Sequence, residues 1–289
     1  MAFQSWRFEN AIFYFMLAAY LLAGIFAWLE GFGKEGLARR FCLGLSVLGF
    51  AANTLVLTLR VMNFEVRPVV IDPYRLINTY EFLLTFSWFT VLVHLFLARR
   101  YKFQASGTFL MPLVFGLLLY GLTVAKPASG QFASFIVYRS RWLLVYFLTS
   151  ALAYGSFAIS FGLGIMYLLK NYLHNTNPRG HLAQRLPGLD LLDELGYRLV
   201  LHGFSFFSAS LIAGAVWNYR AWGTVWSWEP KEAWSFISWL AFVAYLHSRH
   251  LHGWRGNRSA WMTVMGFLAV LFTFIGVSYF LPGQNIFGL

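Results

Sequence analysis

One short stretch, Trp222–Trp234, gathers the side chains best suited to hold a flat ligand. Its sequence, WGTVWSWEPKEAW, contains four tryptophans in thirteen residues, and the wider range 217–239 contains six of the twelve in the chain. Indole rings are large, apolar and carry one N–H, so they serve either as anchors at a membrane interface or as walls of a binding site. Interfacial anchors spread over many helix ends, whereas these tryptophans share one connection with glycine and charged residues. The pattern favours a large, flat, partly apolar ligand, with interfacial anchoring as the alternative.

Histidines form the second group that could do chemistry, because imidazole is a common ligand of iron and other metals. His94, His202 and His247 lie inside apolar segments, where ionisable groups are costly and are functional candidates. A neutral imidazole packed between helices is the alternative for each of them. The other four lie between apolar segments, where a solvated role is expected: His174, His181, His250 and His252.

The composition places these side chains in a membrane. The chain of 289 residues is 59% hydrophobic and only 11% charged, against about 25% charged in a typical soluble domain. The net charge of +11 is expected to reflect basic cytoplasmic loops and contact with anionic lipid, not nucleic acid. The single cysteine, Cys42, excludes an intrachain disulfide. The first apolar run lacks a small-residue cleavage site, so we expect a retained helix.

The expected fold is all-α: a polytopic integral membrane protein forming a single domain over residues 1–289. A helix needs about 20 apolar residues to cross the hydrocarbon core, and eight segments of the chain meet this requirement. They are Asn10–Leu29, Phe41–Leu59, Thr79–Ala98, Gly107–Ala125, Trp142–Leu169, Gly196–Tyr219, Ala233–His250 and Ser259–Leu281.

The distribution of Lys and Arg predicts that both termini lie outside. This orientation places 13 of the 22 basic residues on the cytoplasmic side. The tryptophan-rich connection, between the sixth and seventh helices, then faces the extracytoplasmic side. At about 1.5 Å per residue, His94, His202 and His247 each lie about 21–22 Å from the outer surface, so two of the three could ligate one metal.

The start of the seventh helix is also predicted from residue types. Pro230 suits the first turn of a helix, because its missing N–H has no partner there in any case. Glu229 then occupies the N-cap, for which it is a poor residue, and Glu232 lies in the first turn, where the helix dipole favours an acidic side chain.

WGTVWSWEPKEAW resembles the tryptophan-rich WWD motif of the haem-handling proteins of cytochrome c maturation. The longer run Gly214–Arg249 is similar to the CcsA (ResC-like) branch of System II. Three further matches extend the resemblance over most of the chain from Asn78 onward: NTYEFLLTFSW at Asn78–Trp88, LDELGYR at Leu192–Arg198 and GWRGNRSAW at Gly253–Trp261.

The resemblance implies a function, a cofactor and partners. Proteins of this family work with a CcsB-like (ResB-like) membrane partner, move haem b across the membrane, and present it at the WWD segment, here residues 214–249, to apocytochrome c for thioether attachment at a CxxCH motif. It implies eight helices and a location in a bacterial inner membrane or a thylakoid-type membrane. The implied haem contacts at the loop are Trp222, Trp226, Trp228, Trp234 and Glu229.

The resemblance also implies iron ligands. The YLH of Tyr245–His247 matches the motif whose histidine ligates the transmembrane haem, with the second ligand supplied by the partner. His247 is therefore the first candidate, and His94 or His202 is a possible replacement for the partner's ligand.

At the outer haem site the sequence departs from the family pattern. Tyr146 and Asn285 stand where two external histidines are expected, and Glu229 stands for the aspartate of WWD. Tyrosine can ligate ferric haem, whereas asparagine is a poor iron ligand. The departures predict that bis-histidine ligation is lost at the outer site. They leave open whether the chain is a subunit of a holocytochrome c synthase (haem lyase), and no catalytic acid, base or nucleophile is expected.

Two functions remain open from the sequence. The first is a divergent CcsA-type protein that holds or delivers haem for attachment to apocytochrome c. The second is a paralogue that keeps a fixed haem b and serves as an electron-transfer or structural anchor subunit of a membrane redox or multihaem cytochrome complex. A haem or tetrapyrrole transporter, or a regulator of haem synthesis, is a third interpretation that no residue supports directly.

Overall fold

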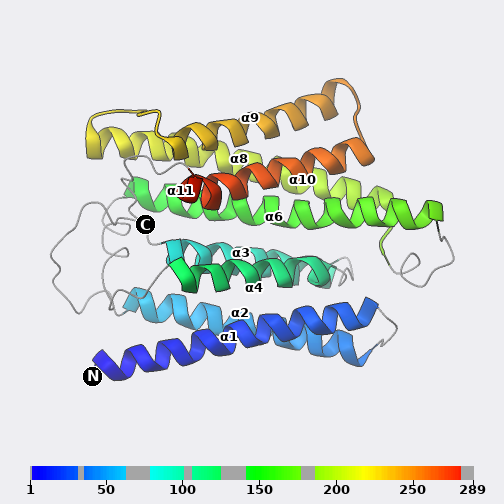
Figure 1. The fold of residues 1–289 in the computed structure, drawn as a ribbon, viewed down its shortest axis with the longest axis horizontal. Coiled ribbons are helices and arrows are strands. Elements are labelled where there is room, and N and C mark those ends of the chain that lie inside the picture. Colours follow the sequence, from blue (N-terminus) through cyan, green and yellow to red (C-terminus); the bar gives the residue numbers. More distant parts are fainter. Residues whose placement is uncertain are drawn as a thin grey trace. The chain divides into compact units, whose positions relative to one another are not determined.

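A computed structural model describes residues 2–31, 36–62, 79–100, 106–124, 141–176 and 186–280. Every regular element in these ranges is helical, which confirms the all-α prediction (Figure 1). The described residues of the first seven predicted segments each lie on one helix, and those of the eighth extend over α10, η2 and α11. The helices are α1 (Ala2–Gly31), α2 (Leu37–Met62), α3 (Thr79–Arg100), α4 (Ser106–Val124), α6 (Arg141–Thr176), α8 (Leu189–Trp222), α9 (Pro230–Leu251), α10 (Asn257–Leu271), the π-helical turn η2 (Phe272–Gly276) and α11 (Val277–Phe280).

Six of the described stretches are long and apolar enough to cross a membrane: Glu9–Glu30, Leu37–Leu59, Phe82–Arg100, Arg141–Thr176, Leu189–Trp222 and Asn257–Gly276. Gly107–Thr123 on α4 is apolar but shorter, and α9 belongs to neither group within the described helices. The chain is therefore a polytopic integral membrane protein. The total of eight spans and the orientation stay predictions.

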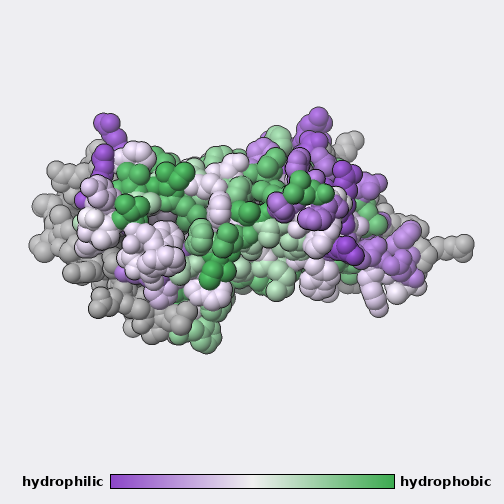
Figure 2. All heavy atoms as spheres, turned by 90° about the horizontal axis from the view of Figure 1, so that it is seen from above, coloured by the Kyte–Doolittle hydropathy of each residue, from purple (hydrophilic) through white to green (hydrophobic). Residues whose placement is uncertain are grey.

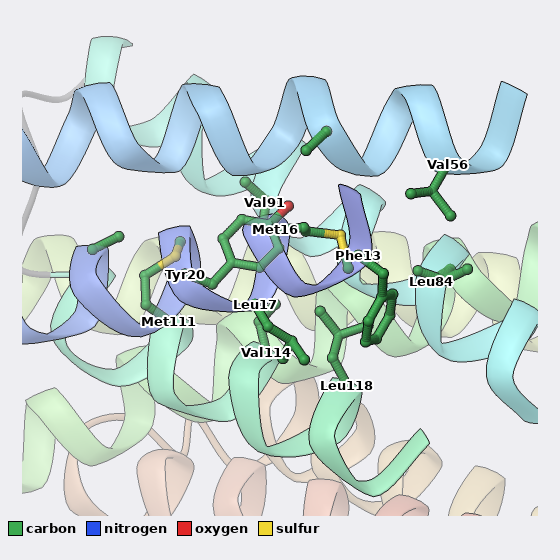
Figure 3. Close-up of a cluster of buried hydrophobic side chains, with 12 residues drawn as sticks. Phe13, Met16, Leu17, Tyr20, Val56, Leu84, Val91, Met111, Val114 and Leu118 are labelled. Atoms are coloured by element: carbon green, nitrogen blue, oxygen red, sulfur yellow. The ribbon is translucent and has the colours of Figure 1, made fainter. Parts of the chain in front are cut away.

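The chain divides into two compact units, Met1–Arg141 and Trp142–Phe287. In the first unit α1 packs against α2 and α4, and α3 packs against α2 and α4. Phe13 and Tyr20 of α1, Met111 of α4, and Leu84 and Val91 of α3 are buried at their common interface (Figure 3). Apolar side chains thus hold this unit together at the meeting of four helices.

The second unit contains α6, α8, α9 and α10, which run side by side along its length (Figure 1). Phe157 of α6 stacks on Phe242 of α9 with ring centroids 3.8 Å apart and meets Phe207 of α8 edge-on. Gly203 makes room for this cluster, because a Cβ there would lie 2.7 Å from Phe157 Cε1. Trp239 of α9 donates from Nε1 to Ser208 Oγ of α8 at 2.9 Å, which joins the two helices that flank the tryptophan-rich connection.

Apolar side chains cover the middle of the face drawn in Figure 2, and hydrophilic ones gather at the right of the view. Exposed polar residues from the end of α9, through the turn, to the start of α10 include His250, His252, Arg255, Asn257 and Arg258. An apolar band bordered by polar residues is the pattern expected of helices in a bilayer.

Candidate functional site

The connection between α8 and α9, called here the tryptophan loop (Trp222–Trp234), begins and ends sharply (Figure 1). Gly223 closes α8 in the left-handed conformation, with φ 75°, and its N–H donates to Tyr219 O at 2.9 Å. Only glycine adopts such a φ without strain, so this residue sets where the loop starts. Pro230 opens α9, and Glu229 is its N-cap without a side-chain capping bond, which confirms both predictions.

A single carboxylate, that of Glu232, organises the loop. Glu232 Oε1 accepts a hydrogen bond from Asn218 Nδ2 at 2.6 Å, and Oε2 accepts two from Ser227, at 2.8 Å from N and 2.9 Å from Oγ. These bonds join the last turns of α8, the middle of the loop and the first turn of α9. The prediction for Glu232 concerned only the helix dipole and missed this role, because its partners are neither charged nor adjacent in sequence.

The four predicted tryptophans take three different positions. Trp222 and Trp228 are exposed, with Trp228 at 73%. Trp226 is half-buried and packs edge-on against Trp228 and Phe236, at centroid distances of 6.0 and 6.2 Å. Its Nε1 is buried and has no acceptor within the part of the chain that the structure describes.

Trp234 turns away from the loop surface. Its ring packs on Phe272 of η2 at 4.4 Å, and its carbonyl oxygen accepts from Thr273 Oγ1 at 3.1 Å. Trp234 therefore ties α9 to the π-helical turn, and π-helical turns occur often at functional sites.

Trp228 has a strained backbone, with φ 58°. A non-glycine residue in this region costs about 1–2 kcal/mol, because its Cβ approaches a carbonyl oxygen. Such a conformation persists only where its surroundings impose it. Here the neighbouring residue Ser227 is held at both N and Oγ by Glu232, and the result is an indole that projects outward.

The charges of the loop perturb one another. Burial and the neighbouring Glu232 carboxylate raise the pKa of Glu229, and Lys231 opposes this rise. Burial lowers the pKa of Lys231, and Glu229 opposes that shift. The loop therefore presents a carboxyl group that takes up a proton more readily than an ordinary glutamate, beside a desolvated amine.

Tyr146 of α6, the residue in place of an expected external histidine, lies at the base of the tryptophan loop. It is half-buried against α8, where a Cβ on Gly214 would lie 3.1 Å from Tyr146 Cδ2. It is also within electrostatic range of the Glu232 carboxylate. Asn285, the other replacement, lies outside the described residues.

His202 and His247 are both exposed, on α8 and α9 of the second unit. His202 Nδ1 hydrogen-bonds with the carbonyl oxygen of Arg198 one turn earlier. The imidazole beside His247 is that of His252, at a centroid distance of 6.1 Å, and the prediction for His252 as a loop residue did not anticipate this pair.

His94 belongs to the first unit and is fully buried on α3. A Cβ on Gly107 would lie 3.3 Å from His94 Cε1 and 3.4 Å from both Ala27 Cβ and Cys42 Sγ. The imidazole is therefore packed where α1, α2, α3 and α4 come close together. The proposed layer of three histidines, and the choice between His94 and His202 as a second ligand, stay predictions.

A polar network lies at the opposite end of α9 from the tryptophan loop. Arg249 pairs with Asp193 through two hydrogen bonds, at 3.0 Å (Nη1–Oδ1) and 2.8 Å (Nη2–Oδ2), and their side chains are only 7% and 13% exposed. Asp193 Oδ1 also accepts from Gly256 N at 3.2 Å, and Arg249 Nη1 donates to Ser259 Oγ at 3.0 Å. This network brings together LDELGYR, GWRGNRSAW and the last residue of the run Gly214–Arg249, and it fixes the end of α9 that carries His247.

A small polar cavity adjoins this network. Its volume is about 10 Å³, and its polar lining residues are Ser160, Tyr167, Asp193, Tyr245, Ser259 and Thr263. Such a volume accommodates one water molecule and no porphyrin. This cavity is therefore too small for a flat ligand. The loop surface, with Trp228, and the exposed face of α9, with His247, are both accessible.

Comparison with known proteins decides the family. The family described as Cytochrome C assembly protein matches residues 76–283, which is more than half of the chain. The chain belongs to this family. The CcsA-like resemblance is thereby confirmed, since the cytochrome c biogenesis protein CcsA of Guillardia theta is 29% identical over 99% of this chain and 97% of its own length. CcsA of Prochlorococcus marinus (strain MIT 9301) is 32% identical over 73% of this chain and 75% of its own length.

A solved structure supports the same fold. The cytochrome c haem lyase CcmF superposes with a TM-score of 0.67 at 19% sequence identity, over 92% of this chain. This chain spans less than half, 46%, of the CcmF chain. At this identity the likeness concerns the fold alone. The protein is a CcsA-like integral membrane protein of cytochrome c biogenesis.

Proposed function

We propose that this protein holds haem b against the tryptophan loop and delivers it for covalent attachment to apocytochrome c. The observation that carries the proposal is the exposed Trp228 ring on a loop pinned by Glu232. A rigid, outward indole offers an apolar face to a porphyrin at little entropic cost, because the ring is already held in place. Family membership favours this ligand over lipid.

One further feature of the loop suits haem. The buried Trp226 Nε1–H has no acceptor among the described residues. A haem propionate would supply one, which would remove the cost of an unsatisfied buried donor. Bound there, haem supplies the vinyl groups that react with the cysteines of apocytochrome c, and the role of this chain is to bind and orient it.

Within the membrane, we propose His247 as the iron ligand. It is exposed on α9, in line with the exposed apolar residues Leu240 and Ala244. An ionisable side chain on such a face is costly against lipid, and a ligand or partner that covers it removes this cost. The second ligand would come from a CcsB-like membrane partner, or from His94 or His202.

The proposal includes a topology. Eight spans with both termini outside would place the tryptophan loop on the extracytoplasmic side, where apocytochrome c is matured. Tyr146 lies near Glu232 at the base of the loop, but the external histidine pair is replaced. We therefore expect weak haem ligation there, and full complementation of a CcsA-deficient strain would contradict this part of the proposal.

The test is a reduced-minus-oxidised spectrum of the protein purified alone and with a CcsB-like partner. We expect a b-type haem signal that His247→Ala abolishes and His174→Ala, at the end of α6, leaves unchanged. If the signal needs no partner, His94→Ala and His202→Ala identify the second ligand. A haem-free protein under both conditions would overturn the proposed function.

A further inference from the structure

Two glutamates of the tryptophan loop have very different surroundings. Glu229 stands at the position of the WWD aspartate, yet its side chain makes no capping hydrogen bond. Glu232, three residues later, accepts three hydrogen bonds from two different segments. We propose that Glu232 is the positioning residue of the tryptophan loop: it holds Ser227 to α8 and α9 and thereby sets the directions in which Trp226 and Trp228 point. The link to haem rests on the proposed function, whereas the link to loop geometry does not.

The position of Ser227 explains how one carboxylate can orient two rings. Ser227 lies between Trp226 and Trp228, and Glu232 Oε2 binds both its backbone N–H and its hydroxyl. Two bonds to one residue restrict both its displacement and its rotation. Trp226 is thereby directed inward against Phe236, and Trp228 is directed outward at a strained φ of 58°.

The other carboxylate oxygen connects this restraint to the scaffold. Oε1 binds Asn218 Nδ2 at 2.6 Å, one turn before the end of α8. Asn218 and Glu232 both lie on regular helices, which are more rigid than the loop between them. Without this bond, Ser227 would remain attached only to the first turn of α9.

The chemistry of the three donors suggests a discriminating experiment. All three partners donate, so the group at position 232 must accept on both sides, which only a carboxylate does. Glu232→Gln keeps the size of the side chain but removes the charge and leaves one oxygen acceptor for the three donors. In the double variant Asn218→Asp/Glu232→Gln, the new glutamine donates to the new aspartate and still accepts from Ser227. Asn218→Asp alone sets two carboxylates against each other.

The measurement is hydrogen–deuterium exchange of the loop peptide in the full-length protein in nanodiscs, without haem. We expect Glu232→Gln and Asn218→Asp each to accelerate exchange of the Ser227 amide about tenfold or more, since a hydrogen bond to a charged group is lost. Glu229→Gln, the matched control, should leave the Ser227 exchange rate unchanged. The double variant should return the rate close to that of the wild type.

Exchange at the wild-type rate in Glu232→Gln, or a double variant that exchanges as fast as the two single variants, would overturn the proposal. Haemin titration of the wild type and the same four variants, followed by tryptophan quenching, then tests the link to the ligand. If the Ser227 amide of Glu232→Gln exchanges at the wild-type rate, the positioning role is wrong, whether or not haem binds. If exchange is altered but no protein binds haem, the wild type included, the proposed function is wrong and the positioning role is still supported.

Discussion

The Asp193–Arg249 pair offers the sharpest test of how the second unit is held together. Asp193→Asn keeps the side-chain size but removes the close charged partner of the Arg249 guanidinium, which is 7% exposed, and leaves only the Glu194 carboxylate at 3.9 Å. Breaking a buried pair by removing one partner costs about 3–5 kcal/mol, because an uncompensated charge stays buried. The hydrogen bond from Gly256 N is retained by the asparagine oxygen, so we expect the lower half of this range.

The neighbouring residue is a matched control. Glu194 lies 3.9 Å from Arg249 and pairs at 2.8 Å with Arg198, but its side chain is 48% exposed. An exposed pair contributes about 0.2–1 kcal/mol, so Glu194→Gln should change stability little. Replacement of both members of the buried pair, by Asp193→Leu with Arg249→Met, should recover much of the loss, because no charge is then left unpaired.

The assay is reversible unfolding in mixed detergent micelles, followed by tryptophan fluorescence. We expect a large loss of unfolding free energy in Asp193→Asn, a small one in Glu194→Gln and an intermediate value in the double variant. Equal effects of Asp193→Asn and Glu194→Gln would show that burial does not distinguish the two carboxylates.

Three further results are expected. Gly203→Ala should destabilise the protein by about 1–3 kcal/mol, because the added Cβ would lie 2.7 Å from Phe157 Cε1 in the stacked cluster. Gly44→Ala, with open space around its Cβ, should not destabilise the protein. Equal unfolding midpoints of the two variants would contradict this prediction. Burial and Glu232 raise the pKa of Glu229. The favourable contribution of Glu229 to the free energy of unfolding is therefore complete below pH 4.5, the ordinary pKa, and is lost as the pH rises through the raised pKa. Unfolding midpoints of Glu229→Gln should accordingly exceed those of the wild type slightly at neutral pH but not at pH 4, and the opposite trend would show that the sign is wrong. Phe272→Ala should loosen the Trp234 contact and accelerate amide exchange at η2, and unchanged exchange there would show that this ring pair does not hold the turn.

The helices could be predicted because each membrane span is a local property of about 20 consecutive apolar residues. The start of α9 at Pro230 and the N-cap at Glu229 were also local, and both predictions were confirmed. The polar network of the second unit could not be predicted in this way, because its residues are far apart in the sequence. Asp193 and Arg249 are 56 residues apart, and either could have faced solvent on its own helix.

The tryptophan loop shows the same division. The number and spacing of its tryptophans indicated a binding surface, but not that Trp234 would turn inward onto Phe272 or that Trp228 would adopt a positive φ. Glu232 was missed because its importance depends on Asn218, 14 residues away on α8. A local pattern predicts which elements form, whereas the contacts that orient side chains depend on residues that meet only after folding.

Haem affinity in a matched pair of tryptophan variants tests whether the tryptophan loop binds haem. Trp228 is 73% exposed on the loop, whereas Trp254 lies in the turn after α9, beneath the guanidinium of Arg258 at 5.3 Å. Haemin titration of the purified protein should show affinity lowered about tenfold by Trp228→Ala and unchanged by Trp254→Ala, since an exposed aromatic ring at the centre of a contact contributes most to binding. Equal affinities for the wild type and Trp228→Ala would show that the exposed ring of the tryptophan loop does not bind haem.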